Sequence, residues 1–196
     1  MDTNRQLHYL FLIFILLNFL TGCTGLTVAS TSAQAVYNRH ELQQQLSDHY
    51  ITLQAYRRIY DNTDRYDNTN LSITTLHNEV LLTGETPNPE QREEIIRIVK
   101  NIPNVIDVHC HITIAGTSSA LTRVSDTWIT TKIKSKFIAM NDLDATRIKV
   151  VTEDGTVYLM GIVLPDQADL AVEIAQNTQG VQSVIKHFSY MRISKT

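Results

Sequence analysis

Apolar positions recur along the chain with two different spacings, and these spacings alternate in a fixed order. A helical spacing of three or four residues occurs at 51–59, 95–102, 129–140 and 170–175. Strand-like alternation or short apolar runs occur at 71–74, 80–82, 105–114, 148–151, 157–159 and 181–193. The pattern predicts helix, strand, strand, helix, strand, twice over. We therefore expect an α+β fold in which each unit packs two helices on a small three-stranded mixed sheet.

Polar residues mark where these elements join. Short polar turns at 77–78 and 153–155 predict that the first two strands of each unit form a hairpin. Asn78 lacks the glycine found at Gly155, but asparagine tolerates the left-handed conformation that such turns need. Asp48 and Asp126 are expected to cap the first helix of each unit.

The two units are copies of one sequence. Residues 78–84 match 155–161, residues 101–108 match 177–184, and Asp48–Thr52 matches Asp126–Thr130. The offset between copies changes only where loops are expected, which indicates a tandem duplication. We place the first module at 46–116 and the second at 119–196. The join at 116–121 is small and polar, so the modules are expected to unfold separately unless packing between them couples them.

The N-terminal residues belong to neither copy. Arg5 precedes an apolar run at 9–17 that is too short to span a membrane, which predicts a signal peptide over 1–22. Residues 23–45 are expected to form a tether, because 24–36 are small and polar. Residues 37–46 either extend a helix or stay in the loop.

The end of the signal peptide, Leu20-Thr21-Gly22-Cys23, resembles the lipobox of bacterial lipoproteins. This resemblance implies a thioether-linked diacylglycerol on Cys23 and a further acyl chain such as palmitate on its amine, enough for stable anchoring. Thr24 stands where an aspartate would favour inner-membrane retention, so the expected location is the periplasmic face of a Gram-negative outer membrane. Cys110, the second of two cysteines, then has no intrachain partner and is expected to be a buried thiol.

Two short motifs carry a family resemblance. Val-x-Leu-x-Gly ends each hairpin at Gly84 and Gly161, and Gly-Val-x-x-Val enters the last strand after Gly180, with Asn104 in the matching place of the first copy. Repeated in register, they resemble the BON domain, a module of bacterial osmotic-stress and outer-membrane proteins. The resemblance implies a lipoprotein with two BON domains, in which Gly84, Gly161 and Gly180 are structural.

Motifs for catalysis are absent from the sequence. There is no nucleophile elbow, phosphate loop, dinucleotide fingerprint or His-Glu-x-x-His, so we expect a non-enzyme without a cofactor. On a strand, His109 and His111 share one face and Cys110 the other, so these side chains cannot converge on a metal; the histidines are expected to face solvent. A net charge of −3 gives no basis for nucleic-acid binding.

Charge and helical geometry point to a partner for the second module. The first module carries ten acidic against six basic residues, and the second eight against nine. On a helical wheel, Trp128 lies about 130° from the apolar stripe, with Lys132 about 40° and Lys136 about 80° from the tryptophan. Alternatively, Trp128 fills a seam between the modules.

Taken with the family resemblance, this pattern implies that the second module contacts anionic phospholipid through Trp128, Lys132 and Lys136 and supports outer-membrane integrity. The alternative is a protein-interaction scaffold for an envelope complex such as the outer-membrane β-barrel assembly machinery. Lipid selectivity, module orientation and oligomeric state stay open.

Overall fold

The computed structural model describes residues 32–61, 66, 68–116 and 120–191. The chain divides after His40 into two units, and residues from Glu41 onward contain both sheets. The predicted signal peptide and Cys23 lie outside the described residues.

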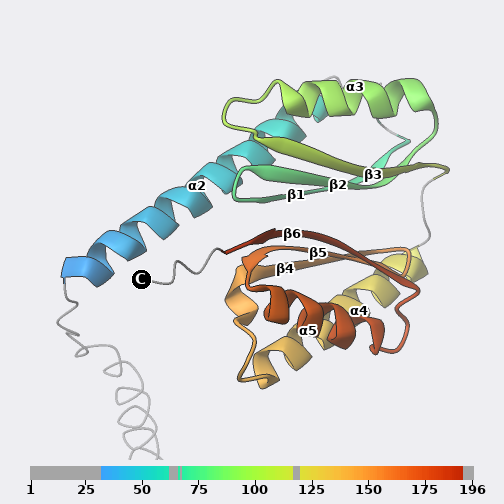
Figure 1. Cartoon of the computed structure of the whole chain (residues 1–196). Helices are drawn as coiled ribbons and strands as arrows, with labels where there is room; N and C mark the ends of the chain where they lie inside the picture. Colours follow the sequence, from blue (N-terminus) through green and yellow to red (C-terminus); the bar gives the residue numbers. More distant parts are fainter. Residues whose placement is uncertain (1–31, 62–65, 67, 117–119, 192–196) are drawn as a thin grey trace, which may run out of the picture. The chain divides into compact units, whose positions relative to one another are not determined.

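The first module contains two helices and one sheet (Figure 1). Its elements are α2 (Ser32–Tyr60), β1 (Asn70–Leu76), β2 (Glu79–Thr86), α3 (Pro89–Lys100) and β3 (Asp107–Ile114). Strand β2 is central, antiparallel to β1 and parallel to β3. The predicted mixed sheet is confirmed.

The second module repeats this order with one addition. Its elements are α4 (Ala120–Ala139), the short 3-10 helix η2 (Ala145–Arg147), β4 (Ile148–Glu153), β5 (Thr156–Val163), α5 (Pro165–Gln176) and β6 (Ser183–Tyr190). Strand β5 pairs antiparallel with β4 and parallel with β6. The sequence pattern did not predict η2, in which the Asp144 side chain accepts a hydrogen bond from the Thr146 amide.

One boundary differs from the expectation. Helix α2 begins at Ser32, inside the segment 23–45 that was expected to be a tether. Small and polar residues at 32–36 gave no apolar periodicity, so the sequence pattern could not show that the helix starts this early.

We expected the two matching aspartates of the repeat to cap helices, and this expectation is wrong. Asp48 and Asp126 lie inside α2 and α4, and each binds the hairpin turn of its own module. The Asp126 carboxylate accepts hydrogen bonds from the amides of Asp154 and Gly155, both at 2.9 Å. The Asp48 carboxylate accepts equivalent hydrogen bonds from the amides of His77 and Asn78, at 2.9 and 2.8 Å.

These bonds stabilise a tight turn. Both turn residues of each hairpin have positive φ, at 51° and 65° for His77 and Asn78 and at 46° and 71° for Asp154 and Gly155. This is the geometry of a two-residue type I′ turn. The aspartate pairs the turn amides, which otherwise have no acceptor in the hairpin ladder.

Each module buries one sheet face under its two helices. In the second module the core combines Ile129, Ile133 and Phe137 of α4 with small residues of α5 and alternate residues of the sheet. In the first, Ile51, Ala55 and Ile59 of α2 occupy the same places. These predicted helix faces are confirmed, but Met140, which was expected to continue the stripe of α4, lies beyond the end of that helix and is 38% exposed.

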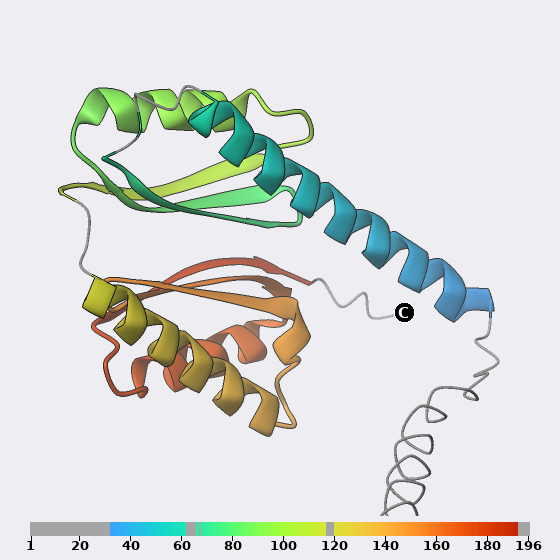
Figure 2. The same ribbon diagram turned by 180° about the vertical axis from the view of Figure 1, so that it is seen from behind.

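The opposite faces of the two sheets meet each other (Figure 2). Leu81 of β2 packs with Tyr158 and Met160 of β5, and none of the three is more than 6% exposed. We call this sheet-to-sheet contact the seam. Packing between the modules, which the sequence left open, is present as this third core. Its signal in the sequence was the unbroken apolar run of β2 and β5, which is typical of strands buried on both faces.

The seam also corrects the placement of two histidines. His109 and His111 do share one face of β3, as predicted, but that face meets β6 of the second module instead of solvent. Cys110 points to the other side, where it packs against the core of the first module.

Candidate membrane-binding site

Helix α4 carries apolar side chains on two opposite sides. One side, with Ile129, Ile133 and Phe137, is buried in the core. Large apolar side chains are also exposed elsewhere on the helix: Leu121 (79%), Val124 (66%), Trp128 (49%) and Ile138 (76%). Exposed apolar residues of this size, clustered on one element, are typical of an interaction surface. We call these four residues with Lys132 and Lys136 the α4 patch.

Trp128 lies in the middle of the α4 patch and pairs with a cation. The Lys132 ammonium lies 4.0 Å from the centre of the indole ring, which is a cation–π contact. Trp128 is half-exposed and does not belong to the residue cluster of the seam. Of the two places that the sequence left open for this side chain, the structure has it on the surface of α4.

Gly180 lies directly beneath Trp128. It has φ +95°, and a Cβ at this position would lie 3.1 Å from Ile129 and 4.0 Å from the indole ring. The glycine therefore lets the α5–β6 turn approach α4 closely. In the first module Asn104 occupies the matching place with φ +70°.

Lys136 has a different environment from Lys132. Its ammonium donates to the Thr178 hydroxyl at 2.9 Å and to the Asn177 carbonyl at 3.3 Å. These acceptors lie at the C-terminal end of α5, where a positive charge interacts favourably with the helix dipole. Lys136 therefore ties α4 to the C-terminal end of α5 and is the member of the α4 patch whose charge is already hydrogen-bonded within the domain.

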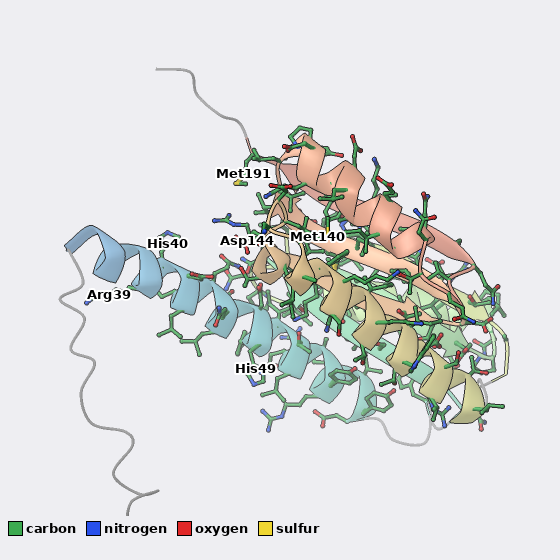
Figure 3. The ribbon with its side chains drawn as sticks, turned by 90° about the horizontal axis from the view of Figure 1, so that it is seen from below. Arg39, His40, His49, Met140, Asp144 and Met191 are labelled. Atoms are coloured by element: carbon green, nitrogen blue, oxygen red, sulfur yellow. The ribbon has the colours of Figure 1, made fainter. Side chains whose placement is uncertain are left out.

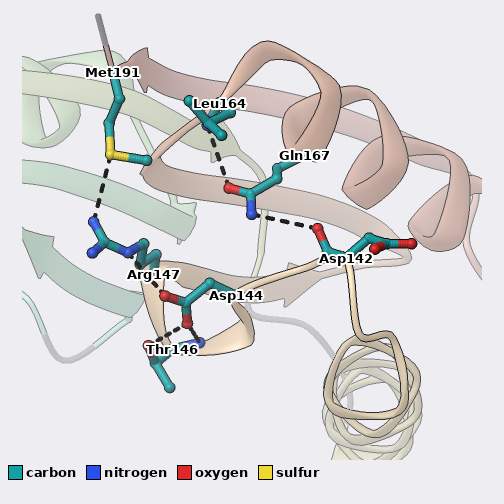
Figure 4. A network of polar contacts seen from close by, with 7 residues as sticks. All are labelled: Asp142, Asp144, Thr146, Arg147, Leu164, Gln167 and Met191. Carbon is teal, nitrogen blue, oxygen red and sulfur yellow. Dashed lines mark hydrogen bonds and ion pairs between the residues drawn. The ribbon is translucent and has the colours of Figure 1, made fainter. Parts of the chain in front are cut away.

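The segment after α4 is held by a polar network (Figure 4). Asp144 accepts from Arg147 Nε at 2.9 Å and from the Thr146 hydroxyl at 2.6 Å. The Thr146 hydroxyl, more than Arg147, holds the pKa of Asp144 below its usual range. Gln167 of α5 donates to the Asp142 carbonyl at 3.4 Å. These contacts fix the end of α4, near which Met140 and Asp144 lie (Figure 3).

The sequence singled out Trp128, Lys132 and Lys136 but missed Leu121, Val124 and Ile138. Their signal was present, because they are apolar and fall outside the stripe that Ile129, Ile133 and Phe137 define. The sequence alone does not show which apolar face of the helix is buried. The residues outside the stripe could therefore be identified as exposed only once the structure had shown that the stripe lies in the core.

Gly84 and Gly161 lie in the central strands, away from the α4 patch. Gly84 has φ +111°, and a Cβ there would collide with the Asn70 carbonyl of β1. At Gly161 a Cβ would lie 2.5 Å from the Arg147 carbonyl. Both positions require close backbone approach between neighbouring strands.

Metal ligation finds no support in the part of the chain that the structure describes. Among these residues no group of three or more His, Cys, Asp and Glu side chains is placed to hold a metal ion. Cys110 is half-buried, and burial raises the pKa of its thiol.

Comparison with protein families decides the identity of the modules. The BON domain model matches residues 47–116 and again 125–192. The chain belongs to the BON-domain family. The two BON matches coincide with the two modules of the fold.

Individual BON proteins resemble the chain over much of its length. It is 27% identical to "Outer membrane lipoprotein DolP" of Haemophilus influenzae over 88% of this chain and 91% of that protein. It is 36% identical to "21 kDa hemolysin" of Actinobacillus pleuropneumoniae over 62% and 63% of the two chains. It is 32% identical to "Osmotically-inducible protein Y" of Escherichia coli over 71% and 70%. The chain is thus a DolP-like protein of the bacterial envelope with two BON domains.

No helix in the described ranges, 32–61 and 120–191 included, is both long and apolar enough to cross a membrane.

Proposed function

We propose that this protein is a lipid-anchored outer-membrane protein whose second BON domain binds anionic phospholipid and so supports the integrity of the membrane, without catalysis. The anchor is Cys23, after cleavage of the signal peptide at 1–22. The binding surface is the α4 patch. The observation that carries the proposal is the exposed Trp128 ring with the Lys132 ammonium 4.0 Å from its centre.

The chemistry of this patch suits a layer of lipid head groups. Tryptophan prefers the boundary between hydrocarbon and water, where its ring is buried and its N–H stays hydrated. Each lysine near an anionic surface adds about 1 kcal/mol of attraction. Leu121, Val124 and Ile138 supply further apolar area that water now covers. The patch therefore combines apolar insertion with electrostatic attraction.

The first BON domain lacks the cation–π pair at the matching positions, although Arg58 occupies the place of Lys136. Tyr50 occupies the place of Trp128 in the repeat, and Gln54 occupies the place of Lys132. Tyr50 is exposed as well, so an exposed aromatic residue is common to both domains and the paired cation is not. This difference supports the second domain as the lipid-binding one.

Anchoring through Cys23 is supported by the sequence Leu20-Thr21-Gly22-Cys23 and by the similarity to the Haemophilus outer membrane lipoprotein. Such an anchor holds the chain at the membrane continuously. Binding by α4 would then occur at high local lipid concentration, so a weak patch is sufficient.

Vesicle binding tests the proposal. The chain without residues 1–23, from which the anchor is removed, is titrated with vesicles of increasing phosphatidylglycerol content. We expect binding to increase with phosphatidylglycerol and to fall about tenfold or more in Trp128→Ala, because insertion of the ring is lost. The melting temperature should change little, because the ring is half-exposed.

Tyr50→Ala is the matched control, since it removes the equivalent exposed aromatic residue of the first domain, and its binding should equal that of the parent. If Trp128→Ala melts clearly lower yet binds phosphatidylglycerol vesicles as tightly as the parent, the membrane-contact assignment is wrong.

A second candidate function is a scaffold for an envelope protein complex such as the β-barrel assembly machinery. It is favoured by a row of exposed leucines on α2, Leu42, Leu46 and Leu53, on the side away from the core. A scaffold would retain its partner on Trp128→Ala and lose it on Leu46→Glu. Binding to charge-neutral vesicles separates the two functions, since only a reader of anionic lipid requires the negative charge.

A further inference from the structure

The seam between the two sheets carries ionisable side chains on both sides of its apolar centre. The centre is formed by Leu81, Tyr158 and Met160. A histidine cluster lies on the edge strands β3 and β6 of the two sheets. It consists of His109, His111 and His187. Glu85 of β2 lies on the same strand face as Leu81, and Glu153 of β4 lies on the same strand face as Val151, which packs against this centre. We call Glu85 and Glu153 the glutamate pair.

The histidine cluster brings three imidazoles into direct contact. His111 Nε2 and His187 Nε2 are 2.9 Å apart, and the ring centres of His109 and His187 are 4.1 Å apart. A hydrogen bond between His111 and His187 requires one Nε2–H as donor and one unprotonated Nε2 as acceptor. Two imidazolium rings cannot make this bond and would repel each other.

Charged and titratable neighbours of the cluster act mainly on His109. Its Nε2 lies 3.1 Å from the Glu79 carboxylate, and its Nδ1 lies 3.8 Å from that of Asp107. From the second module, the ring of Tyr158 lies 4.8 Å from that of His111. The two carboxylates lie beside His109, whereas His111 and His187 face each other.

Burial, followed by the neighbouring imidazoles, lowers the pKa of His187 to about 4 and also lowers the pKa of His111; Asp107 opposes this for His187. The closed seam therefore holds these two rings in the neutral form at neutral pH.

The glutamate pair has the opposite preference. Glu85 is 7% exposed and accepts a hydrogen bond from Asn70 Nδ2 at 2.9 Å. Burial, then the charges of Glu85 and Asp126, raise the pKa of Glu153 to about 7. Asp154 acts in the same direction, and the nearby Thr83 hydroxyl acts against it.

Two cations also line the groove next to Glu153. Arg123 and Lys134 of α4 border a groove of about 490 Å³ that contains Glu153 and Asn70. They do not outweigh burial and the carboxylates around Glu153, whose pKa is still raised.

We propose that the seam is a pH-gated contact with two opposing gates: acid opens it at the histidine cluster, and base opens it at the glutamate pair. Both gates are closed when His111, His187 and Glu153 are all neutral. Opening separates the two sheets and exposes Leu81, Tyr158 and Met160, while each domain keeps the core beneath its own helices.

The two gates act in opposite directions as pH changes. The closed seam lowers the histidine pKa values, so this contribution to closure is present above about 6.5 and is lost as pH falls toward 4. The closed seam raises the pKa of Glu153, so that contribution is present below about 4.5 and is lost as pH rises through 7. Between about pH 4.5 and 6.5 the two slopes offset each other, and removal of one gate reveals the other.

Distances between spin labels on the outer helices test this directly. The labels are placed at Glu93→Cys on α3 and Asp169→Cys on α5, two exposed positions, in the full-length chain in detergent with Cys110→Ala. A sample with Cys110→Ala alone controls for labelling at Cys23. A narrow distance distribution reports a closed seam, and a broad, longer one reports an open seam.

Three proteins are compared from pH 4.5 to pH 8.5. The parent should respond weakly between about pH 4.5 and 6.5. Glu153→Gln should be closed at pH 8 and open on acidification, with the open-to-closed ratio rising about three- to tenfold per pH unit. His187→Gln should be closed at pH 5 and open as pH rises through 7 with a similar slope.

Matched controls are Glu90→Gln and His49→Gln, exposed residues of the first module, which should follow the parent. Circular dichroism at each pH shows whether the domains stay folded. The proposal is overturned if both seam variants follow the parent at every pH, if they respond in the same direction, or if the label distance changes only when the domains unfold.

Discussion

A single buried aspartate per module holds the hairpin that organises each sheet. Asp126 is 6% exposed and accepts both turn amides, and Asp48 does the same in the first copy. The sequence showed the repeat of these aspartates but favoured helix capping, because a capping aspartate and an interior one look alike when the helix start is unknown. The bonding partners are 28 to 30 residues away, a distance that local patterns do not report.

Asp126→Ala removes both acceptors and leaves two turn amides without a partner. Because hydrogen bonds to a charged group contribute about 1.5 to 3 kcal/mol each, we expect the free energy of unfolding to fall by about 2 to 4 kcal/mol. Urea denaturation followed by circular dichroism measures this. Asp142→Ala, at an exposed position whose side chain is not part of the turn, should change stability by less than about 0.5 kcal/mol. Equal midpoints for the two variants would contradict the role given to Asp126.

At the scale of elements, periodicity predicted the order of helices and strands because each has one face in a core. It failed at the start of α2, where residues 32–36 have no apolar stripe, and at η2, which is only three residues long. The candidate site was predicted in part. Trp128 and Lys132 stood out by residue type and wheel position, whereas the seam histidines were expected in solvent because polar side chains on a strand usually are.

The central strand β2 depends on the missing side chain of Gly84. Gly84→Ala places a Cβ against the Asn70 carbonyl at a residue with φ +111°, so both the pairing with β1 and the backbone conformation are strained. We expect a loss of at least about 2 kcal/mol in the free energy of unfolding.

Gly116→Ala is the control for this variant, because a Cβ there has no neighbour within 4 Å, and it should leave stability unchanged. Thermal melts of the two variants give the comparison. If the two variants had the same melting temperature, β1 could move away from β2 without loss of stability, which would contradict this role of Gly84.

For the whole molecule, attachment to the membrane is expected to depend on one atom, the sulfur of Cys23. Cys23→Ala removes the only proposed site for the thioether, so labelling with a fatty-acid analogue in cells should be abolished and the protein should leave the membrane fraction. Cys110→Ala should keep the label, because that thiol packs against the first core. Label that persists in Cys23→Ala would end the lipoprotein proposal.

The seam shows that each BON domain of this chain has one sheet face that a second domain covers. A domain covers one sheet face with its own helices and presents the other to a neighbour, so a lone domain has an unsatisfied apolar face and a pair has none. Two domains in one chain therefore cover each other's apolar faces. A chain with an odd number of such domains would leave one face to be covered by another chain. Duplication of the module thus supplies, within the same chain, the surface that covers the second face of each sheet.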